Sequence, residues 1–280
     1  MKYHVLLIIT VAFIMTSCSS TKAVVAINKS TDQFIVLQKD KRILYEKGAR
    51  ENAKKIAKKL DTAIQTVEQK QYKKFTKPVT IYVCNSIQNF TDYCVHSHAS
   101  GCVLNERLFL SPKNFRANRQ ALTHELAHLH IEQQLGMFSW HSGYPAWFQE
   151  GLATYVSGGE GANLVSAKEA RKAIVEGKTF TPNTSGSLIF RKAAHSFGLT
   201  PNMFYRQAAM FIGYLHDRDT EKFKTFLLSV EAGKNFKKSF SDAYGNSLQE
   251  MWNKFIQHQK SKTEITSTYT ASLLTHDLLH

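Results

Sequence analysis

The stretch THELAHLHIEQ, residues 123–133, governs how this 280-residue chain is interpreted. His124 and His128 are four positions apart in it, and Glu125 follows the first histidine. On an α-helix, residues i and i+4 lie about 40° apart around the axis and one turn apart along it. Two imidazoles at this spacing face one point, as two ligands of a single zinc ion do. Glu125 is then placed to reach a water molecule on that ion without binding the metal itself.

A catalytic zinc ion needs a third protein ligand and an open coordination position. The candidate is Glu150, in the segment WFQEGLATY, with 21 residues between it and His128. The intervening turn GMFSWHSGYPAW contains two glycines and a proline, which favour chain reversal. A helix–turn–helix therefore brings Glu150 beside the two histidines, with Zn²⁺ as the expected cofactor.

The pattern H-E-x-x-H, followed by about 20 residues and then E-G-x-A, resembles the gluzincin metallopeptidases and, among them, the peptidase MA-like family. Six residues match that family's W-[FL]-x-E-G-x-A-x-Y helix: Trp147, Phe148, Glu150, Gly151, Ala153 and Tyr155. The stretch YRQAAMFIGYL at 205–215 resembles a later helix of the family, and Ala243 to Trp252 resembles its closing helix. The resemblance covers residues 75–258 and is strongest at 120–156.

The resemblance implies an α+β, zincin-type metallopeptidase fold with a small N-terminal sheet, an active-site helix and a helical C-terminal part. It implies a peptide or protein substrate, held in extended form beside a strand at Arg107–Ser111. The roles that it implies are zinc ligation by His124, His128 and Glu150, general base catalysis by Glu125, and stabilisation of the oxyanion by Tyr205. Weaker candidates for the last role are Tyr155, Tyr214 and His195.

The chain departs from the family at Thr154, because many gluzincins place an acidic residue four positions after the ligand glutamate to orient one histidine. The aminopeptidase motif that grips a free substrate amine is not visible. Two alternative functions remain: a catalytically silent zincin-fold lipoprotein that acts as a binding module at the cell envelope, and a zinc hydrolase acting on an amide other than a protein.

The N-terminus, MKYHVLLIITVAFIMTSCSS, has the positive start and short apolar run of a secretory signal. The run from Val5 to Met15 is shorter than the roughly 20 residues that span a membrane. Met15 to Cys18 resembles a bacterial lipobox, which implies lipidation of Cys18 after cleavage. We therefore expect export and lipid anchoring to the bacterial envelope, with a plain secretory signal as the alternative.

The expected organisation is a signal peptide at 1–17, a tether at 18–33, a single catalytic domain at 34–259 and a weakly ordered tail at 260–280. The strand-bearing part of the domain covers 34–115 and the helical part 116–259. Hydrophobic periodicity predicts a hairpin on either side of KDK at 39–41 and strands at 78–84 and 107–111. Helices are predicted at 48–71, from Pro112 to 134, and at 145–157, 166–176, 202–216, 219–231 and 247–259.

The formal net charge is +14, but no nucleic-acid-binding motif accompanies it, so we expect no nucleic-acid partner. Besides Cys18 the chain has Cys84, Cys94 and Cys102. Export favours one disulfide, most simply between Cys94 and Cys102, with one thiol left free. An alternative is a separate metal site made by these two cysteines with His96 and His98.

Overall fold

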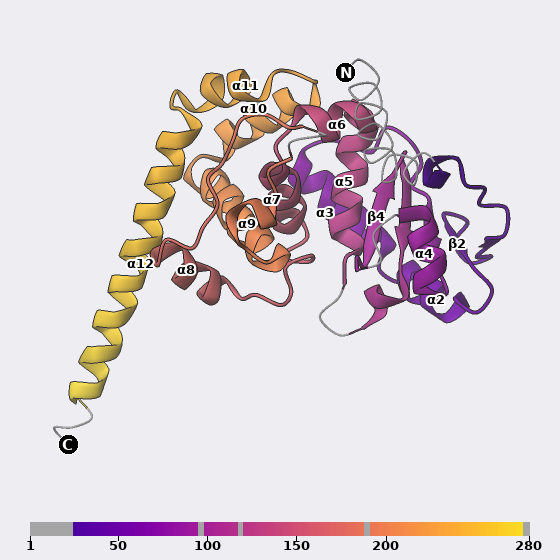
Figure 1. Ribbon diagram of the computed structural model, residues 1–280, viewed down its shortest axis with the longest axis horizontal. Coiled ribbons are helices and arrows are strands. Elements are labelled where there is room, and N and C mark those ends of the chain that lie inside the picture. Colours follow the sequence, from indigo (N-terminus) through magenta and orange to yellow (C-terminus); the bar gives the residue numbers. More distant parts are fainter. Residues whose placement is uncertain (1–24, 95–97, 117–119, 188–190, 277–280) are drawn as a thin grey trace, which may run out of the picture.

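The computed structural model describes residues 25–94, 98–116, 120–187 and 191–276 and has an α+β fold (Figure 1). A small sheet and its covering helices form the N-terminal half, and helices alone form the rest. The signal sequence and Cys18 lie outside the described residues. Among the described helices, none is both long and apolar enough to cross a membrane.

The sheet has five strands in the order β1-β2-β3-β5-β4. The predicted hairpin is confirmed, since β1 pairs antiparallel with β2, whereas β2, β3 and β5 run parallel. β4 pairs antiparallel with β5 and forms one edge. The strands are β1 (Ile35–Val36), β2 (Ile43–Tyr45), β3 (Ile81–Val83), β4 (Gly101–Leu104) and β5 (Arg107–Leu110).

Helices cover both faces of the sheet, because alternate side chains of a strand point to opposite sides. Ile81, Val83 and Leu108 join the main core with α2 (Arg50–Ala57), α3 (Leu60–Gln71) and α5 (Leu122–Leu135). Tyr82 and Phe109 pack on the other face against α4 (Ile87–Cys94). The single helix predicted at 48–71 was therefore wrong in one respect, since α2 and α3 are separate, and α4 was not predicted.

The helix that carries His124 and His128 is α5, and it lies in the middle of the molecule. Nine of its residues are buried, on all sides of the helix, as expected of a helix enclosed by neighbours. Gly136, with φ of 79°, ends α5 and begins α6 (Met137–Gly143). Pro145 then caps α7 (Ala146–Val156), the helix that carries Glu150.

The C-terminal helices pack against α7 or against one another, and those that contact α7 do so through aromatic side chains such as Phe211, Phe226 and Phe236. Gly151 lets α9 approach closely, because a Cβ at this position would lie 2.9 Å from Ala208. These helices are α8 (Ala167–Val175), α9 (Pro201–Arg218), α10 (Thr220–Glu231), α11 (Phe236–Tyr244) and α12 (Leu248–His276).

The last helix runs along the outside of this half and extends beyond it (Figure 1). The helix end predicted near residue 259 was wrong, and the expected tail is helical as far as His276. No proline or glycine occurs after Gly245 to stop the helix.

The predicted disulfide between Cys94 and Cys102 is confirmed and ties the end of α4 to β4. Cys84 is the free cysteine of the described residues, and burial raises the pKa of its thiol. Because the disulfide occupies both sulfur atoms, Cys94 and Cys102 cannot act as thiolate ligands with His98. His96 lies outside the described residues.

Candidate metal centre

The structure brings together His124 and His128 of α5 and Glu150 of α7. The two Nε2 atoms are 3.2 Å apart, and each is 3.5 Å from Oε2 of Glu150. The side chain of His124 is 5% exposed, and those of His128 and Glu150 are 14% and 15% exposed. Three donor atoms therefore face one point that solvent can reach past His128 and Glu150.

The turn between the helices is fixed by a buried glutamine, which sets where Glu150 lies. Nε2 of Gln149 donates hydrogen bonds to the carbonyl oxygens of Trp140 and Tyr144, at 3.1 and 2.7 Å. Both acceptors belong to the segment between α5 and α7, so the residue before Glu150 is held to the reversal itself. From the sequence, the chain reversal was attributed only to the glycines and the proline of this segment.

Glu160, in the loop after α7, holds His124 in two ways. Its carboxylate accepts hydrogen bonds from the backbone N–H groups of Thr123 and His124, at 2.7 and 3.1 Å. Its carbonyl oxygen lies 3.1 Å from Nδ1 of His124. Because a carbonyl only accepts, Nδ1 carries the proton and Nε2 keeps its lone pair for the shared point.

The departure at Thr154 is thereby explained. Its hydroxyl oxygen lies 3.4 Å from the same Nδ1 atom, a weaker contact than that of the Glu160 carbonyl. Gly161 lets the same loop lie directly against the ring of His124. Its φ is +82°, and a Cβ at this position would lie 2.7 Å from Cε1 of His124. A backbone loop thus does what an acidic side chain does in many gluzincins.

Glu125 is buried at the side of α5 that faces the edge strand β4. A Cβ at Gly101 would lie 2.6 Å from Cγ of Glu125, so the strand touches this side chain. Burial, reinforced by the carboxylates of Glu150 and Glu160 against the effect of His124, raises the pKa of Glu125 to about 7. The carboxyl group is therefore poised between its charged and neutral forms near neutral pH.

Tyr205 of α9 lies beside His124, one of the three donors. Its ring stacks on that of His124 with 6.0 Å between centroids. Burial and the charge of Glu150 raise the pKa of its hydroxyl well above the usual value, which keeps the hydroxyl protonated. Arg191, which sequence reasoning missed, donates from Nη2 to Oε1 of Glu150 at 3.3 Å.

The weaker candidates lie elsewhere or lack a contact with this site. The ring of Tyr155 packs against His216 and Phe223, and that of Tyr214 packs against Phe255 and His258. No contact links His195 to the three donors within the described part of the chain. His130, two positions after His128, is fully buried away from the three donors, and its Nδ1 faces Glu231 at 3.8 Å.

The fold and the site define an α+β protein in which two histidines of one helix and a glutamate of the next could hold a metal ion. The family model described as Peptidase MA superfamily matches residues 60–258, and the chain belongs to that superfamily. A peptidase-like function on peptide or protein substrates follows from this membership. No curated protein matches the chain.

Proposed function

We propose that this protein is a zinc-dependent metallopeptidase of gluzincin type, exported and tethered to the bacterial cell envelope by a lipid on Cys18. The observation that carries the proposal is the near-equal spacing of three donor atoms from His124, His128 and Glu150. The superfamily match supports peptide hydrolysis as the class of reaction.

Zinc suits these donors in both chemistry and geometry. Two imidazoles and one carboxylate form a common ligand set of catalytic zinc, which keeps its fourth position open. Ligands at about 2.0–2.1 Å on a tetrahedron lie about 3.3 Å from one another. The three separations here, 3.2, 3.5 and 3.5 Å, bracket that value, so little movement is needed to bind the ion.

The residues around these ligands supply the acid–base chemistry. When bound, zinc makes its water acidic and polarises the substrate carbonyl. Glu125, buried beside these ligands, would accept the proton of the attacking water and deliver it to the leaving amine. The protonated hydroxyl of Tyr205 is the candidate donor to the negative charge that develops on the carbonyl oxygen.

The strand that aligns the substrate is β4. The expectation that Arg107–Ser111 does so was wrong, because β5 is paired on both sides, with β3 and with β4. β4 is the edge strand, and its Gly101 touches Glu125. An extended peptide can add to such an edge through backbone hydrogen bonds. The glycine keeps that edge close to the general base.

The envelope tether rests on the sequence of residues 1–18. Lipidation of Cys18 would leave only a few residues between the acyl chains and the fold. The expected tether at 18–33 was too long, because Arg107 donates hydrogen bonds to the carbonyl oxygens of Ala26, Ile27 and Lys29 and so ties this segment to the fold. Mass spectrometry of the N-terminal peptide from the native host tests this, with a diacylglyceryl-modified Cys18 as the expected result. An unmodified N-terminus beyond Cys18 would instead indicate an ordinary secretory signal.

The enzyme is tested by comparing the parent with Glu125→Gln on a broad peptide library, with zinc content measured on both. We expect equal zinc and a loss of hydrolysis of about 10²- to 10⁴-fold, as for removal of a general base. Equal behaviour of both proteins would favour a silent binding module. Cleavage of cell-wall peptides alone would favour the hydrolase that acts on another amide.

A further inference from the structure

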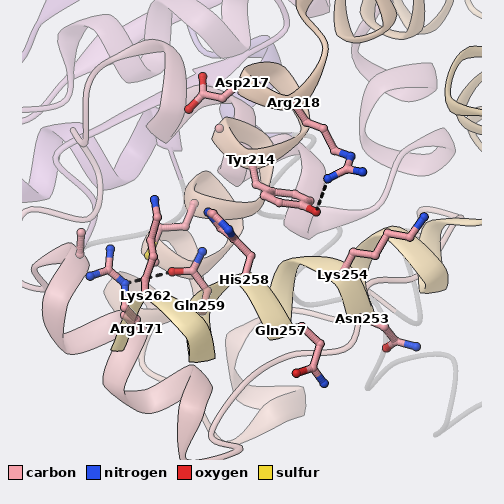
Figure 2. Close-up of a pocket in the computed structure, with 13 residues that line it drawn as sticks. Arg171, Tyr214, Asp217, Arg218, Asn253, Lys254, Gln257, His258, Gln259 and Lys262 are labelled. Carbon is pink, nitrogen blue, oxygen red and sulfur yellow. Dashed lines mark hydrogen bonds between the residues drawn. The ribbon is translucent and has the colours of Figure 1, made fainter. Parts of the chain in front are cut away.

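A groove of about 980 Å³ lies between α8, α9 and α12, away from the candidate metal centre (Figure 2). Tyr214 of α9 and His258 of α12 face each other in its middle (Figure 2). None of the three candidate metal ligands lines it, although α9 carries Tyr205 near its start and Tyr214 near its end.

Positive charge dominates the lining of this groove. Four cationic side chains and one acidic side chain contribute to it: Arg171, Arg218, Lys254, Lys262 and Asp217. The hydrogen-bond acceptors of the first three cations are neutral, namely Gln259, the hydroxyl of Tyr214, and Asn246. Elsewhere on the surface, cations such as Lys238 and Lys77 pair with carboxylates. Within the described residues, the side chains of Arg171, Arg218 and Lys254 therefore keep a positive charge that no carboxylate partner neutralises.

The titration of His258 reports the same excess of charge. Burial and the neighbouring charges of Lys262, Arg171 and Arg218 lower the pKa of this imidazole. All three of these neighbouring side chains are cationic. An anionic group entering the groove would meet an attractive field from these cations.

The cations are spaced along α12 in a regular way. Lys254, His258 and Lys262 follow one another at intervals of four residues and share one face of the helix. Four residues of α-helix rise about 6 Å. In an extended peptide, residues i and i+2 lie about 6.6–6.8 Å apart on one face. Acidic residues at alternate positions of such a peptide would each come near one of these side chains.

The middle of the groove favours a polypeptide over a phosphate polymer. Met210 and Ala167 give it an apolar wall, which suits the side chains between the acidic ones. The ring of Tyr214 already packs against Phe255 and His258, at centroid distances of 5.6 and 5.3 Å. Little of that ring is left for a nucleobase to stack on.

We propose that this groove binds an extended acidic segment of a polypeptide, with carboxylates at alternate positions, as a docking site separate from the candidate metal centre. Arg171 and Lys262 receive carboxylates toward one end of the groove, and Arg218 and Lys254 toward the other (Figure 2). The inference rests on the proposed function only in taking polypeptide as the ligand.

The test is equilibrium binding to the full chain carrying Glu125→Gln, so that hydrolysis does not intervene. The probe is a fluorescein-labelled nine-residue peptide of alternating Glu and Ala, read by fluorescence anisotropy. The control peptide has Gln in place of every Glu. We expect binding of the acidic peptide alone, with an affinity that falls as salt is raised.

A matched pair of double variants separates the groove from general charge. Lys254→Glu with Lys262→Glu should weaken binding at least about tenfold, the effect of roughly 1.4 kcal/mol. Lys237→Glu with Lys260→Glu changes the net charge equally, but neither residue lines the groove, and binding should change less than about twofold. Thermal unfolding checks that each double variant folds. If a Lys→Glu double variant does not fold, the double variant with Lys→Gln at the same two positions replaces it.

Equal losses in the two doubles would overturn the proposal, as would equal binding of the Glu and Gln peptides. Tighter binding of polyphosphate or of a single-stranded oligothymidine than of the acidic peptide would also overturn it and assign the groove to a phosphate polymer. Because binding is measured without turnover, failure here leaves peptide hydrolysis untouched, and absence of hydrolysis leaves the groove untouched.

Discussion

Glu160 accepts two hydrogen bonds from His124: its side-chain carboxylate accepts from the backbone N–H, and its backbone carbonyl oxygen accepts from Nδ1 of the ring. The first contact neutralises an unpaired N–H at the start of α5 and places negative charge where the helix dipole favours it. The second fixes the tautomer that leaves Nε2 free for a metal. One loop residue therefore sets both the position and the protonation of a candidate ligand.

Replacing Glu160 with Ala should destabilise the metal-free protein by about 0.5–2 kcal/mol, the usual cost of a lost helix cap. It should also weaken zinc binding by about tenfold or more, because the loop no longer holds His124. Urea unfolding and competition with a zinc chelator measure the two effects. Glu169→Ala is the matched control, since Glu169 caps α8 far from the metal centre and should lower stability alone.

Replacing Gly161 with Ala should lower zinc affinity because the new methyl group would displace the imidazole of His124. Gly158 is the control, since its φ of +71° is similarly left-handed but nothing lies within 4 Å of a Cβ there. Both substitutions should cost about 1–2 kcal/mol of backbone strain. Calorimetric titration with zinc should show a lower zinc affinity for the Gly161 variant than for the Gly158 variant. Equal zinc affinities would show that Gly161 is needed only for its backbone conformation.

Replacing His128 with Ala should abolish stoichiometric zinc binding. Metal analysis of the purified parent should give about one zinc per chain, and the variant should give none. Chelator should then lower the melting temperature of the parent but leave that of the variant unchanged, because only a bound ligand stabilises the folded state. Retention of zinc in the variant would mean that the ion lies elsewhere.

Glu231 should make the protein less stable as pH rises above neutrality. Burial, against the influence of Lys73, raises the pKa of this carboxyl group to about 8, whereas its unfolded value is near 4.3. The folded state therefore binds more protons than the unfolded state between these values, and the free energy of unfolding falls as pH increases. His130, with a pKa that burial lowers to about 4, has the opposite effect up to its unfolded value near 6.5.

The effect of Glu231 is therefore clearest between pH 6.5 and 8. Over that range Glu231→Gln should remove a decline of the order of 1–2 kcal/mol, measured by urea unfolding at each pH. The stability difference between variant and parent should grow with pH. Parallel curves would show that Glu231 keeps the same protonation state throughout.

The geometry of the three candidate ligands was predictable from sequence because it follows from helix periodicity and a short reversal. His124 and His128 share a face by their spacing, and the turn before Glu150 is marked by glycine and proline. The role of Glu160 was not predictable, since its contact with the ring is made by a backbone carbonyl that every residue possesses.

The edge of the sheet was misassigned for a related reason. The apolar run at 107–111 reads as a strand, and it is one, but a strand pattern does not state how many neighbours the strand has. β4 begins with Gly101 and has little β-forming content of its own. Its place follows from antiparallel pairing with β5 and from the disulfide that joins it to α4.

The three candidate ligands come from α5 and α7, which are separated only by the segment 136–145 that contains the short helix α6. Closing so short a loop costs little chain entropy. The trio is therefore supplied by one local segment of the chain, which ends before α8 begins. Tyr205 and Arg191 come from residues beyond α8. Substitutions in the C-terminal half can therefore change the surroundings of the trio without removing any of its three donor atoms.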